Sequence, residues 1–130
     1  MVILADANIY LAVLLEEVEK QGIIKQTEGN TLASPLILPY EIGNALSAMH
    51  RREKLTENQI LKCYSIFEII PVRLVDVNIK NALRIAADFD IYAYDAYYLE
   101  VAQRYKYPLL SLDQRMKTAA AELGIHLLEV

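Results

Sequence analysis

The sequence has little of several residue types that define large classes of proteins. It contains one cysteine, no tryptophan, four glycines and four prolines among 130 residues. A single cysteine, Cys63, excludes an intrachain disulfide and is typical of proteins from reducing compartments. Because Cys63 lies within a helical pattern, we interpret it as a buried structural thiol and not as a nucleophile.

No segment has the pattern of a membrane anchor or of a nucleotide-binding loop. The apolar stretches fall short of the roughly 20 residues that a membrane helix needs, and the apolar N-terminus lacks the basic region of a signal peptide. We therefore expect a cytoplasmic protein with no membrane contact. The sequence also lacks a Walker-type lysine loop and the pattern Gly-x-Gly-x-x-Gly, so nucleotide cofactors are not indicated.

Composition and charge favour one globular domain with a limited nucleic-acid surface. Apolar residues make up 55% of the chain, which predicts a packed core, and residues 1–130 correspond most simply to a single domain. The net charge of −4 argues against a broad basic surface for duplex DNA. It does not exclude a nuclease, because clustered metal-binding acids lower the charge of a protein by themselves.

Short apolar runs alternate with segments of helical periodicity along the whole chain. Strands are predicted at Val2–Ala5, Thr31–Leu36, Val72–Val75, Pro108–Leu112 and Ile125–Val130. Helices are predicted at Ile9–Glu19, Lys20–Asn30, from Pro39 onwards, behind a capping box at 56–59, and at Asn78–Asp88, Tyr94–Tyr105 and Gln114–Leu123. This order predicts an α/β fold, with a mainly parallel sheet covered by helices on both faces.

Four acidic residues occur at the joints between these elements. Asp6 and Asp113 directly follow predicted strands, whereas Glu41 and Asp95 lie near the starts of predicted helices. In open α/β sheets the ligand crevice lies outside the carboxyl ends of the strands. We therefore expect the four carboxylates to meet at that edge of the sheet.

Carboxylates gathered in this way are typical of sites for hard divalent cations. Magnesium and manganese prefer oxygen ligands, and acids that meet without a cation raise one another's pKa. A bound ion relieves that repulsion and lowers the pKa of its own water. Asp6, Glu41, Asp95 and Asp113 are therefore predicted to be both metal ligands and catalytic residues for Mg²⁺ or Mn²⁺.

A structural alternative exists for two of these acids. Asp6 and Asp113 could each be only the N-cap of the helix that follows. Asp95 is harder to explain structurally, because it shares a helical face with Tyr98 and Leu99, which belong to the core. Acids at the edge of a core need a partner or an ion, and their joint occurrence favours the metal site.

Smaller polar side chains near the acids could support the site. Asn8 lies two residues after Asp6, and Ser111 lies two residues before Asp113, so both could point toward those acids. Asn44 could orient Glu41 or contact a substrate. One or two of the tyrosines near Asp95 could stack on an unpaired base.

Four segments together resemble the PIN-domain family and, within it, the VapC-type toxins of toxin–antitoxin pairs. They are Leu4–Asn8, Pro39–Leu46, Ala93–Ala102 and Leu110–Met116. The resemblance implies a three-layer α/β/α sandwich and a magnesium- or manganese-dependent endoribonuclease, with Asp6, Glu41, Asp95 and Asp113 at the family's four acidic positions. It also implies a homodimer and a small antitoxin whose tail inserts near the acids. Asn8 stands where Ser or Thr is frequent, and Ser111 where Thr is frequent.

The function predicted from these features is cleavage of single-stranded or looped RNA by a metal-activated water, as the toxin of a type II toxin–antitoxin pair. One alternative is a solitary PIN nuclease that acts in RNA maturation or, flap-like, on DNA. A second alternative is a catalytically inactive PIN module that binds RNA or a protein. A neighbouring antitoxin gene would favour the toxin, and magnesium affinity that depends on the acids would argue against the inactive module.

Overall fold

The computed structural model describes residues 1–130 as an alternation of strands and helices. The elements are β1 (Val2–Ala5), α1 (Ala7–Leu14), α2 (Lys20–Thr27), β2 (Thr31–Pro35), α3 (Leu38–Arg51), α4 (Glu57–Ile69), β3 (Val72–Val75), α5 (Ile79–Phe89), α6 (Ala93–Tyr105), β4 (Leu109–Leu110) and α7 (Gln114–Glu122). None of the helices combines the length and apolarity that crossing a membrane requires.

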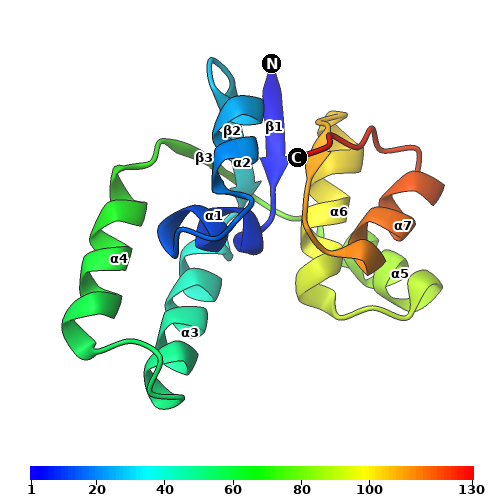
Figure 1. Ribbon diagram of the computed structural model, residues 1–130. Helices are drawn as coiled ribbons and strands as arrows, with labels where there is room; N and C mark the ends of the chain where they lie inside the picture. The colour runs from blue at the N-terminus through cyan, green and yellow to red at the C-terminus, as the bar shows by residue number, and fades with distance from the viewer.

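The four strands form one parallel sheet in the order β3-β2-β1-β4. Helices α1 to α4 lie on one side of the sheet and α5 to α7 on the other (Figure 1). The predicted three-layer α/β/α sandwich is therefore confirmed. The chain first builds the sheet outward from β1 to β3 and then returns through α5 and α6 to place β4 on the free side of β1.

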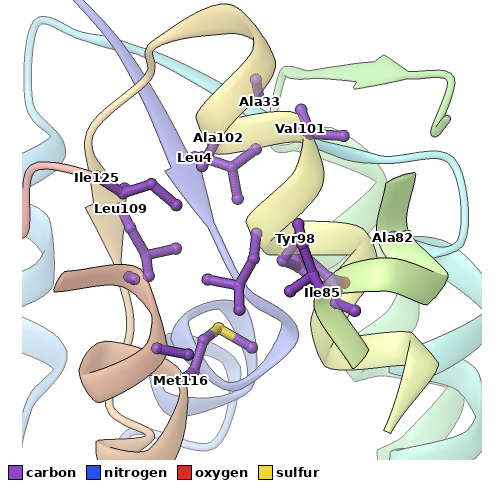
Figure 2. Packing of buried hydrophobic residues seen from close by; sticks show 14 residues of the cluster. Leu4, Ala33, Ala82, Ile85, Tyr98, Val101, Ala102, Leu109, Met116 and Ile125 are labelled. Carbon is purple, nitrogen blue, oxygen red and sulfur yellow. The ribbon is translucent and has the colours of Figure 1, made fainter. Parts of the chain in front are cut away.

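The central strand β1 separates two apolar cores. Ile3, Leu4 and Ala5 are fully buried, and because successive side chains of a strand point to opposite faces, they alternate between the two. Ile3 and Ala5 pack with the first four helices. Leu4 packs with the last three, in the cluster that Figure 2 shows between the sheet and helices α5, α6 and α7. Burial on both faces explains why β1 is a continuous apolar run.

Several predicted elements are shorter in the structure. The helix predicted at Lys20–Asn30 ends at Thr27, and the strand predicted at Pro108–Leu112 is reduced to Leu109–Leu110. The first predicted helix, Ile9–Glu19, ends at Leu14, because Glu16 adopts a left-handed conformation with φ of 54°. The N–H groups of Glu16 and Glu17 then bond to the carbonyls of Val13 and Ala12, which is the Schellman arrangement. Val18, which lies beyond the end of this helix, is 92% exposed.

The predicted last strand, Ile125–Val130, forms a single bridge between Leu127 and Leu109. Its partner β4 has only two residues, so there is little backbone with which a longer ladder could form.

The predicted start of α4 agrees with the structure. Thr56 and Gln59 form the complete predicted capping box at the start of α4. Cys63, expected to be buried, is half-buried against the core beneath α4.

Candidate functional site

The strand order places the ends of β1 and β4 next to each other. Successive crossovers run from β1 toward β3, but β4 lies on the opposite side of β1, so the strand order reverses between these two strands. Ligand crevices in open parallel sheets occur at such reversal points, outside the carboxyl ends of the strands. Asp6 directly follows β1, and Ser111 directly follows β4.

The pairing of β1 with β4 continues into polar residues. Ala5 is opposite Leu110 in the ladder, and the next backbone bond joins the Asp6 N–H to the Leu110 carbonyl at 3.4 Å. Ser111 therefore lies beside Asp6 and donates its hydroxyl to Asp6 Oδ2 at 2.5 Å. The same hydroxyl oxygen accepts from the Asp113 N–H at 3.0 Å. Ser111 thus joins two of the four predicted acids.

Asp6 is a buried carboxylate with an altered pKa. Only 3% of the residue is exposed, and its Oδ1 accepts from the Ile9 N–H at 3.2 Å, which caps α1. Burial raises its pKa to about 6; the bonds from Ser111 and Ile9 oppose this rise, and the charges of Asp113 and Asp95 add to it. Each carboxylate oxygen accepts one bond and so keeps a lone pair for another ligand.

Asp113 is likewise the N-cap of its helix. Its Oδ1 accepts from the N–H groups of Arg115 at 2.9 Å and Met116 at 3.3 Å. Asp6 and Asp113 therefore both act as N-caps, as the structural alternative proposed. Capping alone does not account for the electrostatic coupling of these residues to the other acids. The charge of Asp6 raises the pKa of Glu41, and the charge of Asp113 raises the pKa of Asp6 and Asp95.

Glu41 and Tyr98 form a contact between the two helical layers. Glu41 is in the first turn of α3, and the Tyr98 hydroxyl on α6 donates to its Oε1 at 2.7 Å. Burial raises the pKa of Glu41, the Tyr98 bond opposes this rise, and the charges of Asp95 and Asp6 add to it. The sequence had assigned Tyr98 to the core face of α6. Its spacing three residues from Asp95 was the signal that it also reaches the acids.

Asp95 lies in the first turn of α6 and faces a cation. Burial and the charge of Asp113 raise its pKa, whereas the charge of Arg115 lowers it. The Arg115 guanidinium also donates to the Asp90 carbonyl at 3.2 Å. Arg115 was not predicted as a site residue, and its position in the first turn of α7 gives no periodic signal that distinguishes it from a solvated side chain.

The four predicted acids thus lie within electrostatic reach of one another at the carboxyl edge of the sheet. Every acid in the set interacts with at least one other, and the pKa of Asp6, Glu41 and Asp95 is raised. In this arrangement no three histidine, cysteine, aspartate or glutamate side chains are close enough together to hold an ion directly.

The three predicted supporting residues have different positions. Ser111 is buried and bonds to both strand-following acids. Asn8 and Asn44 are exposed and line a groove beside Glu41. Neither asparagine forms a hydrogen bond with one of the acids, although both line the same groove as Glu41.

Comparison with known proteins gives a family match and several solved structures with this fold. The PIN domain family model matches residues 3–122. PAE2754 from Pyrobaculum aerophilum is 24% identical with a TM-score of 0.64, over 95% of this chain and 98% of that one. VapBC2 from Rickettsia felis, solved bound to a DNA fragment from their promoter, is 15% identical with a TM-score of 0.69, over 99% and 98%.

A third similar structure is VapC20 of Mycobacterium tuberculosis, described as a toxin that cleaves the sarcin-ricin loop. It is 12% identical with a TM-score of 0.62, over 90% of this chain and 94% of that one. No curated protein matches the sequence. At these identities the solved structures show a shared fold, and the family model covers all four acidic positions. The chain belongs to the PIN domain family.

Proposed function

We propose that this protein is a Mg²⁺- or Mn²⁺-dependent endoribonuclease that cleaves single-stranded or looped RNA. The observation that supports the proposal most strongly is the coupling of Asp6, Glu41, Asp95 and Asp113 at one edge of the sheet, where three of them have a raised pKa. A fold gains no stability from acids that repel one another. Perturbed carboxylates in a cleft are a recognised mark of a functional site.

The donor set fits a hard divalent cation. It consists of carboxylate oxygens whose pKa values are raised first by burial and further by the charges of the neighbouring acids. A bound cation would oppose both effects, because it favours the charged carboxylates. Magnesium keeps several of its waters and needs only one or two carboxylates as direct ligands. Asp6, Asp95 and Asp113 would hold it directly or through water. Binding through water agrees with the structure, in which no three acids are close enough together to hold an ion directly.

Within this proposal the chain's own residues position the reaction. The bound ion would supply a water of lowered pKa and positive charge beside the phosphate. Glu41, held in place by the Tyr98 hydroxyl, would complete the metal shell or orient the attacking water and accept its proton. Ser111 would keep Asp6 and Asp113 in register, in the manner of the partners that orient metal ligands.

Within the same proposal the protein is the toxin of a type II toxin–antitoxin pair, inhibited by a small antitoxin. The support is the fold shared over nearly the whole chain with VapBC2 and VapC20. We also propose a homodimer, because apolar side chains such as Ile79 and Leu83 on α5 are 56% and 51% exposed and would be covered by a second copy. Sedimentation that gives only monomer at micromolar concentration would contradict the dimer.

The decisive experiment is cleavage of a structured RNA pool by the wild-type protein and the Asp95→Asn variant in magnesium, manganese or EDTA. The proposal expects cutting that needs both the metal and Asp95. Asp88→Asn is the matched control, because Asp88 is an exposed aspartate on α5 whose charge does not contribute to the raised pKa of Asp6, Glu41 or Asp95. This variant should leave cutting unchanged. Absence of cutting by the folded wild-type protein under all conditions would argue instead for an inactive binding module.

A further inference from the structure

A groove of about 410 Å³ lies beside Glu41. Its walls come from α1, α3 and α6, and Glu41 itself is part of the lining. The groove is therefore continuous with the edge of the sheet where the acids lie. A molecule that occupied it would be held beside the reacting centre.

Two exposed aromatic rings line this groove from different helices. Tyr40 on α3 is 75% exposed, and Tyr94 on α6 is 55% exposed. Tyr94 is held in place by an edge contact to Tyr97, with the ring centroids 5.9 Å apart. Large rings that stay exposed at the rim of a cleft have no role in the core, but they offer faces on which a planar ligand can stack.

Two amide side chains lie in the same groove. Asn8 on α1 and Asn44 on α3 are both exposed and both line it. A side-chain amide offers donors and an acceptor in one plane, which matches the edge of a nucleobase. Aromatic faces and amide edges together are the chemistry with which proteins bind an unstacked base.

We propose that this groove binds one unpaired nucleobase of the substrate, with Tyr40 and Tyr94 stacking on its faces and Asn8 and Asn44 contacting its edge. The inference rests on the proposed nuclease function and adds the site at which an unpaired base of the RNA would be recognised. A base can enter the groove only when it is unpaired, so the site selects single-stranded over duplex RNA. Tyr40 and Tyr94 are thus specificity residues and take no part in the chemical step.

The groove lies where a base would be next to the acids. A nucleotide seated there would place its base in the groove and its phosphate at the edge of the sheet, because Glu41 is part of the groove lining. The protein carries a net charge of −4, so a broad attraction to phosphates is weak, and stacking is the remaining source of sequence-tolerant affinity.

Binding of a fluorescent single-stranded RNA hexamer in magnesium tests the groove in the Asp95→Asn background, in which cleavage is suppressed. Tyr40→Ala and Tyr94→Ala should each raise the Kd about 5- to 100-fold, the range expected for one lost base stack. Tyr40→Phe should bind like its parent, because the ring is kept. Tyr105→Ala is the control, since this tyrosine is 41% exposed at the opposite end of α6 and should change nothing.

A second probe separates stacking from contact with the backbone. In a hexamer of abasic residues the phosphates remain but the bases are gone, so the parent and Tyr40→Ala should bind it equally weakly. Equal Kd values for the parent and both alanine variants on the normal hexamer would contradict the proposed base-binding groove. Absence of RNA binding by the parent would contradict it as well. Cleavage by the wild-type protein, measured separately, decides the nuclease function on its own.

Discussion

The Tyr98 hydroxyl on α6 donates a 2.7 Å hydrogen bond to Oε1 of Glu41 on α3. Tyr98 is 1% exposed, and burial together with the neighbouring charge of Glu41 raises its pKa, so the hydroxyl stays protonated and acts as a fixed donor. The contact connects helices that lie on opposite faces of the sheet. It thereby sets the distance between Glu41 and the acids on the other side.

Tyr98→Phe should keep the fold and shift the pH dependence of cleavage. Removing the donor raises the already elevated pKa of Glu41, so the acidic limb of the activity profile should move to higher pH. A hydrogen bond to a charged group contributes roughly 1.5–3 kcal/mol, so the free energy of unfolding at pH 7 should fall by about that much. Tyr10→Phe is the matched control, because Tyr10 is also buried and its hydroxyl bonds to Ser34. An unshifted profile in Tyr98→Phe would exclude this role.

Asp6→Asn should abolish cleavage and stabilise the fold at neutral pH. The pKa of Asp6 is about 6 when folded and 3.8 in the reference state, so the folded protein binds this proton more tightly than the unfolded chain. The contribution of Asp6 to stability is therefore most favourable below pH 4 and is lost as the pH rises through 6. At pH 7 the charged form costs about 3 kcal/mol.

The asparagine variant should accordingly melt several degrees above the wild type at pH 7 and close to it at pH 4. Calorimetry at both pH values measures this. Added magnesium should raise the melting temperature of the wild type more than that of the variant, since the ion stabilises only the state that binds it. A variant that is less stable than the wild type at pH 7 would show that Asp6 serves the fold through its charge.

Ser111→Ala should weaken the metal site without removing an acid. The hydroxyl holds Asp6 and the Asp113 N–H together and lowers the pKa of Asp6. Its loss should raise the magnesium concentration needed for half-maximal cleavage by roughly 10- to 100-fold, as for other groups that orient metal ligands. Ser111→Thr keeps the hydroxyl and should restore binding. Ser65→Ala on α4, where the hydroxyl bonds only to the Leu61 carbonyl, should have no effect on magnesium binding.

Arg104→Ala should destabilise the protein while leaving cleavage per folded molecule unchanged. Glu100 is only 2% exposed, and Arg104 is its cationic partner at 2.9 Å. Removing that partner leaves a buried carboxylate with one remaining donor, the Asn78 N–H, and should lower the free energy of unfolding by about 3 kcal/mol. Lys20→Ala breaks a surface pair with Glu16 and should cost less than about 1 kcal/mol. Urea titration compares the two.

The sequence predicted those parts of the fold that local chemistry determines. β1 and β3 have the bounds that the sequence predicted, and the Thr56–Gln59 capping box is complete. The acids could be placed at one edge because each follows a strand or opens a helix. These features depend on residues that are neighbours in the chain.

Features that depend on distant contacts were not predictable in the same way. No local pattern marks the reversal that sets β4 beside β1, and only that reversal brings Ser111 to Asp6. Tyr98 reaches Glu41 across 57 positions. The early end of α1 was missed because a glutamate, Glu16, adopts the left-handed conformation that usually indicates glycine.

Residues in the left-handed conformation at helix ends are positions at which substitution could stabilise the folded protein. Glu16, Glu53 and Lys106 hold φ values of 54°, 61° and 57° at the ends of three helices, a conformation that costs a side-chain-bearing residue about 1 kcal/mol. Glycine at these positions would remove the strain and leave the acids untouched. The thermal tolerance of the molecule can therefore be increased from helix ends that carry none of the four acids.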